Sequence, residues 1–203
     1  MKAMWVTDRA VCGQERFEAV LAALAGASGL CVQLREKDLA DLESLALARH
    51  CRAVLGPGVT LIVNRRFDIA LSGGAGGTHL PADGLPVRRV RANTPRGFRI
   101  GVSAHSTEGA AQAIEEGADL VVLGPIFDTP SKRAFGSPLG LRALDGLPPL
   151  AGHGADVYAI GGIALESLEE IARRSDRVSG AAAIRLFQDS PDPKALAEKM
   201  ARL

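Results

Sequence analysis

The 203-residue sequence has little of what marks several protein classes. Lys and Arg number 24 against 23 for Asp and Glu, so the net charge is only +1. Without a basic surplus we expect no nucleic-acid partner. No uncharged apolar stretch approaches the roughly 18 residues of a membrane span, and Asp8 and Arg9 interrupt the N-terminus before a signal-peptide core can form. We therefore expect no membrane partner and a cytoplasmic location.

Cysteines and aromatic residues are also scarce. The three cysteines, Cys12, Cys31 and Cys51, show no CxxC spacing and stand among apolar residues or beside expected helices, which favours reduced, buried thiols. Aromatic residues make up only 4% of the chain, so Ala, Leu, Val and Ile must fill the core. The 47% of hydrophobic residues excludes a disordered chain.

What the sequence does have is a regular alternation of short apolar runs and helix-length amphipathic segments, which is typical of buried parallel strands joined by helices. The predicted strands are Ala3–Thr7, Leu30–Leu34, Thr60–Val63, Thr78–Leu80, Arg99–Ser103, Leu120–Gly124, Val157–Ile160 and Val178–Ile184. The predicted helices are Glu15–Ala25, Leu39–Leu55, Phe67–Ser72, Val87–Arg91, Thr107–Glu116, Leu139–Leu144, Leu165–Ser175 and Lys194–Leu203.

This alternation predicts an α/β fold, a single (β/α)₈ TIM barrel over residues 1–203, at about 25 residues per unit. A doubly wound sheet is the alternative, because strand order is not readable from one sequence. Its GxGxxG turn should follow the first strand, where the chain reads TDRAVCGQ instead. No Gly, Ser or Pro linker long enough to separate two domains is present.

In a TIM barrel the carboxyl ends of the strands meet at one mouth, where the chemistry takes place. The residues expected there are rich in cations and hydrogen-bond donors, which suggests an anionic small molecule. The cationic ones are Arg35, Lys37, Arg65, Lys132 and Arg185, against the acids Asp8, Glu36 and Asp128.

The segment AIGGI places Gly161 and Gly162 directly after the seventh predicted strand. Two glycines allow backbone N–H groups to approach an oxyanion, and TIM barrels commonly bind phosphate between the loops after strands seven and eight. Arg185, after the eighth strand, would form the other wall of this site. A simple tight turn is the alternative interpretation.

Among the histidines, His105 is the candidate general acid or base, because GVSAH places it just past a strand end, with Ser103 on the same side by two-residue alternation. His79, in THLP, is interpreted as a packing residue, with a second base as the alternative. His50 and His153 are expected on the surface.

Several blocks in order resemble the thiamin phosphate synthase/TenI superfamily, over nearly the whole chain. They are WVTDR (5–9), QLREKD (33–38), VNRRFDIAL (63–71), THLPADGLP (78–86), IGVSAHSTEGAAQAIEEGADLVVLGPIFDTPSKR (100–133), SPLGL (137–141) and AIGGI (159–163).

The resemblance implies a compact TIM barrel that binds a thiazole phosphate and, in the synthase branch, also a pyrimidine diphosphate. It assigns Gln33, Arg35 and Lys37 to the pyrimidine and its diphosphate, and Asn64 matches the asparagine of the family's NDR motif, among the substrate-binding residues. Thr129 and Ser131 would lie near the thiazole, Lys132 near the diphosphate, and Gly161 and Gly162 at the thiazole phosphate.

The sequence departs from the synthase pattern where that pattern implies two Mg²⁺ ligands. The aspartate of the family's NDR motif is replaced by Arg65, and the aspartate of its GQxD element falls on Gly84, one position from Asp83. Asp68 is more typical of a helix's first turn than of a ligand. We therefore expect no metal, and Mg²⁺ only if the chain is a synthase.

The missing carboxylates and the LPADG segment are more similar to the TenI-type thiazole tautomerases. The resulting hypothesis is a metal-free isomerase that acts on a thiazole phosphate, with His105 transferring the proton. One alternative is a thiamin phosphate synthase, a transferase that joins pyrimidine diphosphate and thiazole phosphate. A third is a non-catalytic thiazole-phosphate-binding regulator. The expected protein partner is a second copy of the chain, in a homodimer.

Overall fold

The computed structural model describes residues 1–129 and 137–203. Its eight strands run parallel and close into a barrel in chain order, with β8 pairing with β1. This arrangement confirms the predicted (β/α)₈ barrel and excludes the doubly wound sheet, which has open edges. The strands are β1 (Lys2–Val6), β2 (Leu30–Leu34), β3 (Thr60–Asn64), β4 (Gly77–Leu80), β5 (Arg99–Ala104), β6 (Leu120–Leu123), β7 (Asp156–Ile160) and β8 (Gly180–Ala183).

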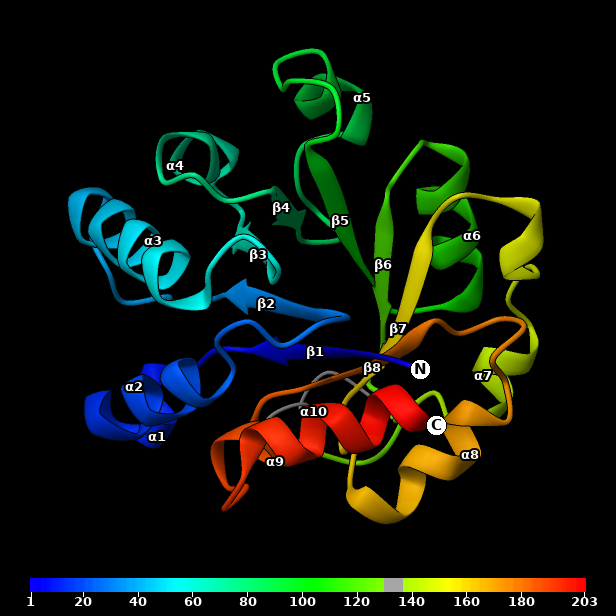
Figure 1. The fold of residues 1–203 in the computed structure, drawn as a ribbon. Coiled ribbons are helices and arrows are strands. Elements are labelled where there is room, and N and C mark those ends of the chain that lie inside the picture. Colours follow the sequence, from blue (N-terminus) through cyan, green and yellow to red (C-terminus); the bar gives the residue numbers. More distant parts are fainter. Residues whose placement is uncertain (130–136) are drawn as a thin grey trace.

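The helices lie around the outside of the strands (Figure 1). Within the described part of the chain none of them is long and apolar enough to cross a membrane. They are α1 (Arg9–Cys12), α2 (Gln14–Ala23), α3 (Asp41–Leu55), α4 (Phe67–Ser72), α5 (Val87–Arg91), α6 (Thr107–Glu115), α7 (Arg142–Asp145), α8 (Leu168–Ala172), α9 (Arg185–Gln188) and α10 (Pro193–Arg202), with 3₁₀ turns at Leu150–Gly152 and Leu165–Ser167.

Two predicted elements differ from the observed ones for a local backbone reason. The eighth strand is Gly180–Ala183 rather than Val178–Ile184, because Ile184 has φ −95° and ψ −76° and turns the chain into α9. The helix predicted over Leu139–Leu144 begins only at Arg142. Gly140 before it has φ +72°, which a right-handed helix does not accommodate.

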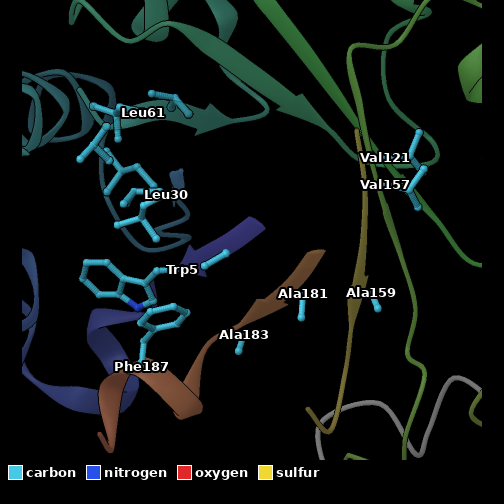
Figure 2. Close-up of a cluster of buried hydrophobic side chains, with 14 of the residues drawn as sticks. Trp5, Leu30, Leu61, Val121, Val157, Ala159, Ala181, Ala183 and Phe187 are labelled. Carbon is cyan, nitrogen blue, oxygen red and sulfur yellow. The ribbon is translucent and has the colours of Figure 1, made fainter. Parts of the chain in front are cut away.

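The strands carry two separate apolar clusters, one inside the barrel and one outside. The inner cluster consists of strand residues alone: Met4, Val6, Cys31, Ile62, Leu120, Val122, Tyr158 and Ala182. The larger outer cluster joins the opposite faces of the strands to the helices. Figure 2 shows part of it, including Trp5 of β1 and Phe187 of α9. The helix residue Phe17 packs on Trp5 with ring centroids 5.6 Å apart.

The amino end of the barrel is closed by charged side chains from three strands. Asp156 of β7 accepts hydrogen bonds from Lys2 Nζ of β1 and from Arg99 Nη2 of β5, each at 2.6 Å. The Asp156 side chain is only 14% exposed. Burial raises the pKa of this carboxyl, but the two hydrogen bonds outweigh burial and hold the pKa below its ordinary value.

The cysteines are free thiols, as expected, but they are not all buried. Burial raises the pKa of Cys31 and of Cys51 to about 12, so both stay protonated. Cys12, in the short helix α1, is partly exposed.

Candidate functional site

A hydrogen-bonded pair, His79 and Ser103, lies inside the barrel toward the carboxyl ends of the strands. His79 Nε2 is 2.8 Å from Ser103 Oγ. His79 pairs in register with Asn64 of β3 and with Gly101 of β5, and Gly101 pairs with the inward-facing Leu120. Because paired residues of neighbouring strands face the same side, His79 and Ser103 both point inward. The interpretation of His79 as packing alone was therefore incomplete.

His79 is a neutral imidazole. It is only 2% exposed, and burial, with a smaller effect from the charge of Arg35, lowers its pKa to about 3. An imidazole with this pKa carries no charge at neutral pH. His79 therefore interacts with Ser103 through a hydrogen bond and not as a charged group.

A second neutral pair lies beside the first. Gln33 Nε2 of β2 donates to Asn64 Oδ1 of β3 at 3.3 Å. Gln33 is 3% exposed and Asn64 is half-buried at the end of its strand. Together the two pairs make the inner part of the mouth polar but uncharged.

The start of the loop after β2 is fixed by a buried hydroxyl. Thr7 Oγ1, completely buried after β1, accepts a hydrogen bond from the Arg35 amide at 2.9 Å and donates to Glu36 Oε1 at 2.5 Å. Glu36 Oε2 also accepts from the Arg9 amide at 2.9 Å. These bonds hold the backbone of Arg35 at the mouth while its side chain stays available.

Four predicted cations stand at this end without a carboxylate partner. Among residues 1–129 and 137–203 none of them forms an ion pair: Arg35, Lys37, Arg65 and Arg185. Arg35 is half-buried and the other three are exposed. Arg65 adopts a left-handed backbone with φ +67°, and its amide donates to the carbonyl of His79 at 2.7 Å. Unpaired cations gathered at one end favour an anionic ligand.

Gly161 and Gly162 let the loop after β6 run close alongside the end of β7. The amides of Ile126 and Phe127 donate to the carbonyls of Ile160 and Gly161 at 2.8 and 2.9 Å. A Cβ on Gly162 would lie 2.6 Å from the carbonyl oxygen of Asp128. Both glycines have positive φ, +96° and +64°. The two glycines therefore allow the two loops to approach closely, and their phosphate role stays a prediction.

The loop after β8 is very short and leads directly into a helix. The short helix α9 begins at Arg185, directly after β8. A short extra helix at this point commonly completes the phosphate site of TIM barrels. Arg185 thus lies in the predicted wall, at the N-terminus of this helix.

His105 is held at the rim of the barrel by a hydrogen bond of its ring nitrogen Nδ1. Its Nδ1 is 2.8 Å from the carbonyl oxygen of Gly124, at the end of β6. A carbonyl can only accept, so Nδ1 donates and the neutral ring carries its lone pair on Nε2. The side chain is exposed.

The remaining predicted site residues lie in the segment after β6. Thr129 is half-buried and has interactions within the chain. Ser131 and Lys132 lie outside the described residues, so their predicted contacts stay predictions.

Comparison with known proteins identifies relatives over nearly the whole chain. The model of the thiamine monophosphate synthase family matches residues 3–187. The chain belongs to this family. A putative thiamine-phosphate synthase of Geobacter sulfurreducens is 38% identical over 98% of this chain and 92% of its own length. The thiamine-phosphate synthase of Methanoculleus marisnigri is 40% identical over 88% and 85%. Among solved structures, thiamine phosphate pyrophosphorylase from Pyrococcus furiosus superposes with a TM-score of 0.82 at 26% identity, covering 99% of this chain and 94% of that one.

These relatives contradict the tautomerase prediction. They are named as synthases, or as the equivalent pyrophosphorylase, and they match over most of the chain. The predicted isomerase activity was therefore wrong, and so was the predicted proton transfer by His105. The prediction rested on two missing carboxylates, which concern a metal and not the reaction itself. The four cations that form no ion pair within residues 1–129 and 137–203 offer another way to stabilise negative charge at the mouth.

The described residues of this family member do not fit the Mg²⁺ site on two aspartates that the resemblance implies. Within residues 1–129 and 137–203 no group of three or more His, Cys, Asp or Glu side chains is placed to hold a metal ion. Arg65 is a cation where one ligand is expected. Glu36 is bonded to Thr7 and to the Arg9 amide, and Asp68 is paired with Arg66 at 2.7 Å. Asp83 is exposed in the loop after β4.

Proposed function

We propose that the chain is a thiamine-phosphate synthase, a transferase that joins a pyrimidine diphosphate to a thiazole phosphate and releases diphosphate. The names of the relatives support this reaction. The observation that carries the proposal is a set of four cations without an ion pair in the described part of the chain, around a neutral polar interior: Arg35, Lys37, Arg65 and Arg185. That arrangement suits two phosphorylated heterocycles, with the rings inside and the phosphates at the rim.

In this reaction the thiazole nitrogen forms a C–N bond to the methylene carbon of the pyrimidine as the C–O bond to diphosphate breaks. The electron pair of the C–O bond leaves with the diphosphate, so negative charge grows there. Guanidinium and ammonium groups aimed at the leaving group stabilise this charge most in the transition state.

The proposal assigns each predicted residue to one substrate. To the pyrimidine diphosphate it assigns Gln33, Arg35, Lys37, Asn64 and Lys132. To the thiazole phosphate it assigns Thr129, Ser131, Gly161, Gly162 and Arg185. Ser103 and His105 are assigned to the region between the two substrates. The chain acts as one barrel domain over residues 1–203, and a homodimer stays a prediction that sedimentation can check.

Release of diphosphate is expected only when both substrates are present. The purified chain is incubated with pyrimidine diphosphate, with thiazole phosphate and with both, at saturating Mg²⁺, and diphosphate and the coupled product are measured. Binding of both compounds without coupling would instead support the regulator. Release of diphosphate from the pyrimidine compound alone would indicate a hydrolase and contradict the proposal.

Replacing Arg35 by alanine is expected to raise the KM for the pyrimidine diphosphate about 10- to 100-fold, because a charge-assisted hydrogen bond to phosphate is lost. The KM for the thiazole phosphate should change less than threefold. Steady-state kinetics with each substrate varied in turn measure both values. The matched control is Arg88→Ala, on the exposed face of α5, which should leave both unchanged. Equal effects of the two variants would contradict the role of Arg35.

A further inference from the structure

The two ring nitrogens of His79 have very different surroundings. Nε2 is 2.8 Å from Ser103 Oγ. Nδ1 is buried and has no hydrogen-bond partner among the residues that the structure describes. A neutral imidazole carries one proton, so the question is which nitrogen holds it and therefore whether Ser103 accepts or donates.

The backbone of Gly101 lies close to Nδ1. A Cβ on Gly101 would lie 2.7 Å from Nδ1, so the C–H bond that a Cβ would replace points toward this nitrogen. A lone pair facing a Cα–H group makes a weak attraction. An N–H there would meet the C–H head-on and remain a buried, unpaired donor, which folded proteins avoid. The lone pair therefore belongs on Nδ1 and the proton on Nε2.

The direction of the hydrogen bond between His79 and Ser103 follows from this. If Nε2–H donates to Ser103 Oγ, the hydroxyl proton of Ser103 is not used by His79. His79 is the one side chain hydrogen-bonded to Ser103 Oγ in the described part of the chain. Ser103 faces inward at the end of β5, so its proton is free to point at a ligand in the mouth.

We propose that His79 is a positioning residue that donates to Ser103 and thereby fixes the Ser103 hydroxyl as a hydrogen-bond donor to an uncharged acceptor atom of the bound pyrimidine ring. The choice of a ring atom over a phosphate follows from the neutral side chains beside the pair, Gln33 and Asn64. The cations Arg35 and Arg65 come only after the ends of β2 and β3. The identity of the ring rests on the proposed function. The direction of the His79–Ser103 bond does not.

This arrangement is insensitive to pH. Burial keeps His79 neutral, with a pKa of about 3, so the ring does not gain a second proton near neutrality. A second proton would also have to be placed on Nδ1, against Gly101. The donor character of Ser103 is therefore constant near neutral pH.

The first test measures the tautomer directly in the free protein. In a sample with ¹⁵N-labelled histidine, the signals of His79 are assigned by their loss in His79→Gln. We expect a protonated Nε2 and a bare Nδ1, with no change from about pH 5 to 9. A proton on Nδ1, or titration within this range, would overturn the proposal. Because no substrate is present, this result is independent of the synthase proposal.

The second test asks whether His79 acts through Ser103. His79→Leu removes the donor and should lower kcat/KM for the pyrimidine diphosphate about 10- to 50-fold, whereas His79→Gln, which keeps an N–H donor, should stay within about fivefold of the wild type. Ser103→Ala together with His79→Leu should be no slower than Ser103→Ala alone.

The matched control is His50→Leu, which breaks an exposed contact to Glu18 and should change nothing in catalysis. Thermal unfolding of each variant shows whether the barrel is intact. Equal losses in His79→Leu and His79→Gln, or losses that multiply in the double variant, would show that His79 does not act by orienting Ser103.

Discussion

Replacing Asp156 by alanine is expected to lower the free energy of unfolding by about 3 kcal/mol, the largest stability effect that we predict. Asp156 is the only carboxylate bonded to both Lys2 and Arg99 in the described residues, and it joins three strands at the amino end of the barrel. Its removal leaves two cations side by side. Lys2 is half exposed, so water can solvate it, and this limits the loss to the lower end of the range for broken buried pairs. Urea unfolding measures the effect as a lower midpoint at an unchanged slope.

The pH dependence provides an independent check. The pKa of Asp156 is depressed in the folded protein, so its contribution is fully present above about pH 4 and is lost as the pH falls through the folded-state pKa. The difference between wild type and Asp156→Ala should therefore shrink in acid. The matched control is Asp145→Ala, which breaks a 2.6 Å pair with Arg174 where the carboxylate is 53% exposed, and about 1 kcal/mol or less should be lost. Equal losses in the two variants would contradict a structural role for the ion pairs of Asp156 with Lys2 and Arg99 at the amino end of the barrel.

The fold was readable from the sequence because the pattern that specifies it is local. Each strand is a short apolar run, and Leu30–Leu34 was predicted with its observed bounds, as were the helices Phe67–Ser72 and Val87–Arg91. Ends of elements were less readable, because a dihedral angle decides them. Nothing in the letters of the eighth strand indicates that Ile184 leaves the sheet.

The site was only partly readable, for a geometric reason. Alternation along one strand predicted that Ser103 faces the mouth. That its partner is His79 depends on the register between β4 and β5, which a single strand does not encode. A useful signal was nevertheless present: Gly101, two residues before Ser103, marks a place where a neighbouring group comes close to the backbone.

The predicted reaction was wrong because it depended on the absence of two metal-binding carboxylates and not on the polar and cationic side chains that are present at the mouth. The replacement of a metal ligand by Arg65 changes how negative charge can be stabilised at the mouth. It leaves in place the neutral pairs and the other cations, Arg35 among them. Relatives that cover most of the chain carry the synthase name, which contradicts the tautomerase prediction.

Replacing Gly162 by alanine is expected to weaken binding of the thiazole phosphate about 100-fold, the largest effect on a ligand that we predict. The loss of affinity comes from position, because a Cβ at residue 162 would lie 2.6 Å from the Asp128 carbonyl oxygen and the loop after β6 must move away. The φ of +64° adds strain of about 1 kcal/mol, which lowers stability and not affinity. Both segments border the predicted phosphate site. Calorimetric titration with thiazole phosphate alone measures the effect without depending on turnover.

The control separates strain from position. Gly117 also has a positive φ, +89°, but a Cβ there would meet nothing within 4 Å, and it lies between α6 and β6 at the amino end of the barrel. Gly117→Ala should therefore lower stability by about 1 kcal/mol and leave the affinity for thiazole phosphate unchanged. If Gly162→Ala binds the phosphate as tightly as the wild type, the ligand does not rest on the segment after β7. The glycines there would then serve only to bring two loops together.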